Sequence, residues 1–174
     1  MTLPGLLVPV DMVLLVLLGV CAGTDLRTGR IFNAVTYPAI AAGLIAAALG
    51  YGPALRDSAL GCLVGGGALY VMFAMGWMGG GDVKFMAAVG ALRGYPFVLH
   101  ALFYSVFFGG VAAGLILIWR GHARGVASDL AAIVWRLMGG RAAAAPIPSR
   151  GGSFPFGVAI GLGTLTALAL SWRG

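Results

Sequence analysis

Two aspartates stand beside the sequence features that could support chemistry. Asp82 follows three consecutive glycines in the segment MGGGDVKFMA, residues 78–87, and Asp25 opens the polar segment DLRTGR between two apolar runs. All five acidic residues of the chain are aspartates, so any carboxylate chemistry must draw on this short set. Two neighbouring carboxyl groups cannot easily both ionise, and they therefore share one proton.

Such a carboxyl pair can hydrolyse a peptide bond. One carboxylate takes a proton from the attacking water, while the protonated partner hydrogen-bonds the carbonyl oxygen of the substrate. This chemistry needs no metal, and His100 and His122 fit no zinc-binding pattern. Cys21 and Cys62 lie in apolar runs without metal-ligand spacing, which is typical of buried free thiols. We therefore expect neither a metal nor another cofactor.

The glycines before Asp82 add to the case for a site. Gly79, Gly80 and Gly81 leave the backbone free to turn and to admit another chain closely. Asp82 would then lie at the N-terminus of the next helix, where the helix dipole favours negative charge. A flexible hairpin with an aspartate as N-cap is the simpler alternative. A second acid on the same face of a membrane, Asp25, favours the paired site.

The elements that must position these residues are membrane-spanning helices. The chain of 174 residues is 60% hydrophobic and 9% charged, with a mean hydropathy of +1.00, far more apolar than soluble domains. Its net charge of +6 is dispersed in short segments between apolar runs, which argues for orientation in a lipid bilayer and against nucleic-acid binding. The sequence predicts an all-α integral membrane protein.

About six spans are expected. Runs of about 20 apolar residues, enough to cross the bilayer, occur at about 5–23, 34–52, 58–78, 97–119 and 154–172, and a shorter run at about 82–92. The positive-inside rule then places both termini outside and both Asp25 and Asp82 at the cytoplasmic face. We expect a retained first span, because no Lys or Arg precedes the first apolar run.

Nothing in the composition marks a second domain, so residues 1–174 are expected to form one transmembrane domain. Its cytoplasmic loop, about 120–153, contains a stretch with apolar residues at helical spacing that predicts an amphipathic helix on the membrane surface before the last span. Small-residue pairs that allow close helix packing occur at Gly19/Gly23, Gly61/Gly65, Gly110/Gly114 and Gly157/Gly161.

Two motifs together resemble those of a known family. The segments DLRTGRIFN (Asp25 to Asn33) and GGGDVKFMAAVGA (Gly79 to Ala91) are similar to the aspartate motifs of the type IV prepilin peptidases, membrane aspartic proteases with a GxGD motif. FPFGVAIGLG (Phe154 to Gly163) looks like the C-terminal signature of that family. The resemblance implies cleavage of a short basic leader from a prepilin or pseudopilin with an N-terminal hydrophobic helix, in the inner membrane.

The resemblance also implies roles for single residues. Asp25 and Asp82 match the catalytic pair, and Gly79 and Gly81 would shape the GxGD turn. Lys84 would be an accessory residue that tunes Asp82 electrostatically or neutralises the pair.

Other polar residues near Asp25 have several interpretations. Arg27 and Arg30 are typical cytoplasmic retention signals, though either could contact a carboxylate near the site. Asn33 could cap the second span. Where many relatives have Ile-Pro-Asn, this chain reads Ile31-Phe32-Asn33, so the turn after Asp25 lacks the rigidity of a proline.

The chain departs from the longer family members. It lacks their cytoplasmic insert with two CxxC pairs, and it resembles the short form associated with Flp or Tad pili. We therefore do not expect N-methylation or an S-adenosylmethionine site.

Two other classes of function stay open. A small transporter component could use the same aspartates to relay protons or bind cations, but it should place acids near the bilayer midplane or in two related halves. A catalytically silent assembly subunit predicts that both aspartates can be replaced without loss of pilus maturation.

Overall fold

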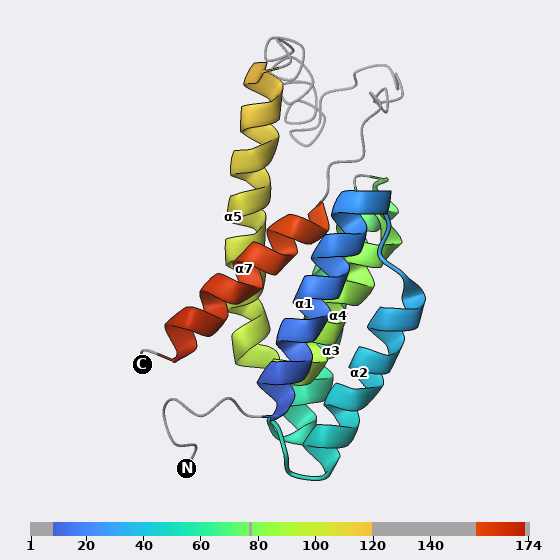
Figure 1. Ribbon diagram of the computed structural model, residues 1–174. Helices are drawn as coiled ribbons and strands as arrows, with labels where there is room; N and C mark the ends of the chain where they lie inside the picture. Colours follow the sequence, from blue (N-terminus) through green and yellow to red (C-terminus); the bar gives the residue numbers. More distant parts are fainter. Residues whose placement is uncertain (1–8, 77, 120–155, 173–174) are drawn as a thin grey trace, which may run out of the picture. The chain divides into compact units, whose positions relative to one another are not determined.

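The computed structural model describes residues 9–76, 78–119 and 156–172, and within these ranges every regular element is a helix. The helices are α1 (Pro9–Thr28), α2 (Asn33–Ala48), α3 (Leu55–Ala74), α4 (Gly80–Arg93), α5 (Tyr95–Trp119) and α7 (Phe156–Ser171) (Figure 1). The expected all-α architecture is confirmed, and each expected apolar run corresponds to one helix. The expected amphipathic helix within 120–153 lies outside the described residues.

The chain divides into two compact units. The first comprises residues 1–109 and 155–174, and the second comprises residues 110–154. Of the second unit, the structure describes Gly110–Trp119, the C-terminal part of α5. The packing and the site described below belong entirely to the first unit.

Among the described residues, three helices are long and apolar enough to cross a membrane, namely α1, α3 and the Tyr95–Leu115 part of α5. The apolar helices α2 and α7 are shorter, with 16 residues each. Their lengths agree with a membrane protein whose spans differ in length.

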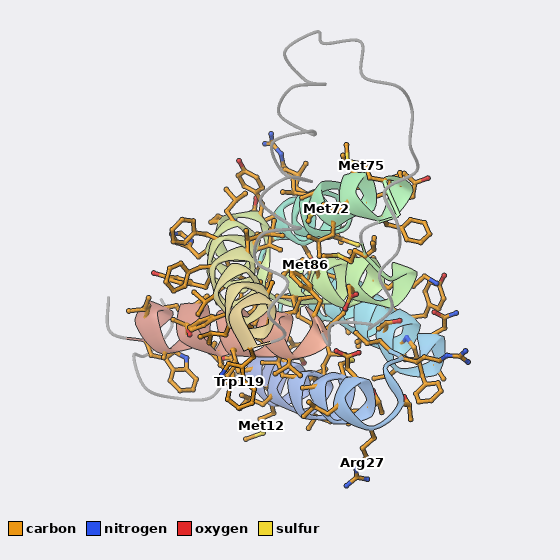
Figure 2. The ribbon with its side chains drawn as sticks, turned by 90° about the horizontal axis from the view of Figure 1, so that it is seen from above. Met12, Arg27, Met72, Met75, Met86 and Trp119 are labelled. Carbon is orange, nitrogen blue, oxygen red and sulfur yellow. The ribbon has the colours of Figure 1, made fainter. Side chains whose placement is uncertain are left out.

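Helix α4 is the centre of the first unit. It contacts α1, α2, α3 and α7, and its residues from Phe85 to Leu92 are all buried. Met86, at 0% exposure, lies in the interior (Figure 2). Fourteen residues make a helix of about 21 Å, shorter than the roughly 30 Å hydrocarbon core. A helix that is apolar all round is stable when protein surrounds it, as here.

Glycines let α2 and α3 approach α4 at the level of the backbone. A Cβ added to Gly43 would lie 2.7 Å from the carbonyl carbon of Ala91, and one added to Gly65 would lie 2.7 Å from the Met86 carbonyl oxygen. Gly61 meets the backbone of α4 at still closer range. The predicted packing role of Gly61 and Gly65 is therefore confirmed.

The other predicted pairs behave differently. A Cβ added to Gly19 or Gly23 would have no described atom within 4 Å, so the expectation of close packing at these two glycines is wrong for the described part of the chain. Gly110 and Gly114 lie in the second unit, and their packing stays a prediction. The pair Gly157/Gly161 faces α1. A Cβ added to Gly161 would make ordinary contact with Ala22, and one added to Gly157 would lie against the Asp25 carboxylate.

Candidate active site

Asp25 lies in the last turn of α1 and is 7% exposed. The sequence placed Asp25 just after the first span, whereas the helix continues to Thr28 and carries the aspartate within it. The helix ends because Gly29 takes a φ of +63°, a left-handed conformation that glycine adopts without strain, while its amide still donates to the Asp25 carbonyl oxygen at 2.8 Å.

The carboxylate of Asp25 is held by the N-terminus of α7. The Gly157 amide, in the first turn of α7, donates a hydrogen bond to Asp25 Oδ2 at 2.9 Å. Backbone amides and the dipole at a helix N-terminus both favour a negative charge there. A Cβ on residue 157 would lie 2.8 Å from the same oxygen, so glycine is what allows this approach.

Asp82 lies in the first turn of α4, and Gly79 is the N-cap residue of that helix. Its carboxylate turns back toward the Gly79 backbone, with Oδ2 3.4 Å from where a Cβ on residue 79 would be. An acid three residues after the N-cap interacts favourably with the free amides of the first turn. Asp82 is half-buried and lies close enough to Asp25 for the two charges to interact.

One cavity of about 370 Å³ brings the two aspartates together. Its lining consists of Asp25, Gly29, Arg30, Ile31, Phe32, Asn33, Gly79, Gly80, Gly81 and Asp82. The cavity is thus built from the end of α1, the connection to α2 and the first turn of α4. Of the residues that the two aspartate motifs predicted to lie at or near the site, all but Lys84 and Arg27 line this cavity.

Gly81 allows the first turn of α4 to pack against the segment that follows Asp25. A Cβ on residue 81 would lie 2.9 Å from Ile31 Cβ, whereas one on residue 80 would lie 3.3 Å from the edge of the Phe73 ring. The closest approach is therefore at Gly81, the second fixed glycine of the GxGD pattern. Gly80, the variable position of the pattern, faces the Phe73 side chain, which can move.

Lys84 contacts α2 rather than a carboxylate. Its Nζ donates to Asn33 Oδ1 at 2.9 Å and lies 5.0 Å from the centre of the Tyr37 ring. Asn33 is the first residue of α2, and Phe32 holds the N-cap position without a side-chain cap. The expectation that Asn33 caps α2 is therefore wrong, because its side chain accepts the lysine hydrogen bond instead.

Arg27 points away from the helices and from the cavity (Figure 2). Of the two arginines that could contact a carboxylate, only Arg30 lines the cavity. Sequence reasoning missed Gly157, although it lies inside the segment FPFGVAIGLG that drew attention. In the part of the chain that the structure describes, no group of three or more His, Cys, Asp or Glu side chains could hold a metal ion.

A family model described as the type IV leader peptidase family matches residues 12–114. The matched residues include both aspartates and the glycines before Asp82. Helix α7, whose amide holds Asp25, lies beyond them. No curated protein and no solved structure matches the chain.

Proposed function

Because the chain belongs to the type IV leader peptidase family, we propose that it cleaves the leader peptide from Flp-like prepilins, with Asp25 and Asp82 as the catalytic pair. The family supports a membrane peptidase in general. The observation that carries the finer proposal is the single cavity that both aspartates line. The two aspartates are far apart in the sequence, so nothing local brings them together. They meet because the last turn of α1 and the first turn of α4 line the same cavity.

The reaction proceeds by activation of water between the two carboxyl groups. The ionised carboxylate removes a proton from water as the water oxygen attacks the scissile carbonyl carbon, and the protonated partner donates its proton to the carbonyl oxygen. The tetrahedral intermediate then collapses: the C–N bond breaks, the first carboxyl group delivers its newly acquired proton to the leaving amine, and a hydroxyl of the intermediate returns its proton to the partner carboxylate as the new carboxylic acid forms. The pair finishes with one proton, as it began.

The position of the cavity suits a substrate that is partly inside the membrane. Asp25 and Asp82 lie at one end of their helices, so a substrate helix beside the bundle can remain in the bilayer while its leader reaches the cavity. The scissile bond must be extended, because the carbonyl of a helical peptide is engaged in its own hydrogen bond. Arg27 and Arg30 at this end support a cytoplasmic orientation in the inner membrane by the positive-inside rule.

The test is co-expression with a Flp-type prepilin in membranes, followed by mass determination of the pilin N-terminus. Wild-type protein should remove the leader, and Asp25→Asn and Asp82→Asn should each reduce the rate by at least about 10²-fold, the usual contribution of a general acid or base. Asp57→Asn is the matched control, since Asp57 lies in the first turn of α3 and does not line the cavity. Cleavage at the wild-type rate by either active-site variant, inserted at normal levels, would refute the assignment.

A further inference from the structure

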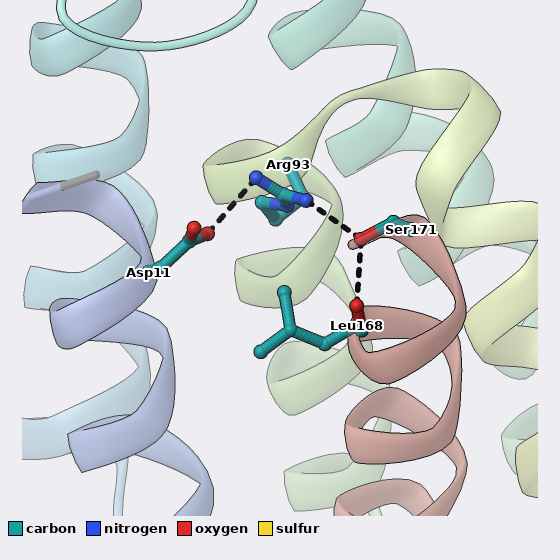
Figure 3. Close-up of polar contacts among 4 residues, drawn as sticks. All are labelled: Asp11, Arg93, Leu168 and Ser171. Carbon is teal, nitrogen blue, oxygen red and sulfur yellow. Dashed lines mark hydrogen bonds and ion pairs between the residues drawn. The ribbon is translucent and has the colours of Figure 1, made fainter. Parts of the chain in front are cut away.

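A polar network joins three helices at the opposite end of α4 from Asp82 (Figure 3). Arg93, in the last turn of α4, places Nη1 2.9 Å from Asp11 Oδ1 of α1 and donates from Nη2 to Ser171 Oγ of α7 at 3.1 Å. Ser171 in turn donates to the Leu168 carbonyl oxygen at 2.8 Å. The Asp11 side chain is 1% exposed and that of Arg93 is 22% exposed, so the carboxylate of this ion pair is buried.

The same three helices build the candidate active site at their other ends. Helix α1 carries Asp25, α4 carries Asp82, and α7 carries the amide that holds Asp25. At about 1.5 Å per residue, the network lies about 21 Å from the site along α1 and α7, and about 16 Å from it along α4. The three helices are therefore linked at the far end by Arg93, and α1 and α7 are also linked at the site by the Gly157 hydrogen bond to Asp25.

Helix α1 packs against the core through side chains, among them Leu14 and Leu18, rather than through close backbone contact. The helices α2 and α3 meet α4 through glycines at backbone distance, as at Gly43 and Gly65. The glycines of α1, Gly19 and Gly23, have no described atom within 4 Å of an added Cβ. Side-chain contacts alone allow more sliding and tilting than interlocked backbones do. The Asp11–Arg93 ion pair adds a polar contact to α4 at the far end of α1.

We propose that Arg93 is a positioning residue for the aspartate pair: it holds α1 and α7 against α4 through Asp11 and Ser171. The proposal rests on the proposed function. A buried ion pair is a poor source of stability but can specify one arrangement of helices. A tilt of α1 by about 3° about its far end would move Asp25 by about 1 Å, and misplacement of a reacting group by 1 Å can cost about 10²-fold in rate.

The variant that separates positioning from folding is the double substitution Asp11→Leu with Arg93→Met. Replacing both charges by apolar side chains leaves no unpaired buried charge, so the protein should remain folded with an unchanged or higher melting temperature. We expect kcat for leader cleavage to fall about tenfold to 10²-fold per folded molecule, with KM within about threefold of wild type. Arg93→Lys alone, which keeps the charge, should retain more of the wild-type kcat than the double variant does. Met12→Leu, beside Asp11 but exposed, is the matched control.

A distance measurement tests the same proposal without cleavage. Spin labels on Arg27→Cys and Met75→Cys report on α1 and on the end of α3, which is packed against α4, and both positions are exposed. The native thiols, Cys21 and Cys62, are replaced by Ala and Ser. The double variant should show a shifted or broader distance distribution than wild type in lipid, as measured by double electron–electron resonance.

The two readouts distinguish failure of the positioning role from failure of the proposed function. An unchanged distance distribution with unchanged kcat per folded molecule in the double variant would overturn the role of Arg93. A lower melting temperature with unchanged distance and kcat would also overturn it, because Arg93 would then serve stability alone. If the distance distribution changes in the double variant but the wild type cleaves no prepilin, the role of Arg93 in holding the helices would be supported and the peptidase assignment would be refuted.

Discussion

Replacing Gly157 by alanine should separate activity from stability. The new Cβ would lie 2.8 Å from Asp25 Oδ2 and 3.0 Å from both Asp25 Cγ and Ile31 Cδ1. Since carbon and oxygen pack comfortably at about 3.5 Å, the carboxylate must retreat by about 0.7 Å. The atoms that yield belong to side-chain ends, so the backbone of α7 can remain in place while Asp25 moves away from the Gly157 amide.

The expected magnitude follows from that displacement. A shift of about 0.7 Å, against the 10²-fold cost of about 1 Å, predicts a fall in kcat of about tenfold to 10²-fold, or roughly 1.4–2.7 kcal/mol in the barrier. Alanine is a better helix former than glycine by about 0.5–1 kcal/mol, which offsets the strain of the contact. The free energy of unfolding should therefore change little.

Gly161→Ala is the matched control, one turn later on the same helix. Its Cβ would lie 3.6 Å from Ala22 Cβ, an ordinary contact, and it carries the same gain in helix propensity. The assay is the initial rate of leader removal per folded enzyme in proteoliposomes, with thermal unfolding followed by circular dichroism. A Gly157→Ala rate within twofold of wild type, or an equal loss in Gly161→Ala, would refute the reasoning.

The glycines and the lysine near the cavity should differ in importance. Gly81→Ala should slow leader removal by about tenfold or more, because its Cβ displaces Ile31 beside the site. Gly80→Ala should slow it by less than about threefold, because the new Cβ meets the movable edge of the Phe73 ring. The rates of the two variants are compared in the same cleavage assay, and equal rates would contradict this prediction. Lys84→Met should lower the free energy of unfolding by about 1 kcal/mol or less and the cleavage rate by less than about tenfold, because it loses one exposed hydrogen bond to Asn33. A loss of rate as large as that of Asp82→Asn in the same cleavage assay would instead show that the lysine takes part in catalysis. The rate should follow a bell-shaped pH profile, since the pair has no base when both carboxyl groups are protonated and no acid when both are ionised; a rate that rises steadily to high pH would exclude the shared-proton mechanism.

Hydropathy alone was enough to predict the helices, because burial in lipid is a property of local composition. Each apolar run of the chain corresponds to a helix, and the runs also placed Asp25 and Asp82 at one end of the bundle. Hydropathy was less informative about where helices end. Helix α1 continues through Asp25 and Arg27 to Thr28, because backbone hydrogen bonding does not stop where apolar side chains stop.

Contacts between distant segments were beyond reach of the sequence. The family resemblance implies that Lys84 tunes Asp82 or neutralises the pair, yet its side chain donates to Asn33 of α2. Nothing in the sequence indicates that Asp11 of α1 and Arg93 of α4 meet, and the fold pairs them. Such pairings depend on how helices rotate about their axes, and hydropathy does not encode that rotation.

Residue types and their order establish the chemistry that this protein can offer: a membrane-embedded helical chain, five aspartates, and two of them beside motifs typical of a peptidase family. Tertiary structure alone decided which groups surround those aspartates. The amide of Gly157 reaches Asp25 because glycine lets the first turn of α7 approach, and that helix begins more than a hundred residues later in the chain. Residue types are local facts, whereas the position of a carboxylate depends on every helix packed against it.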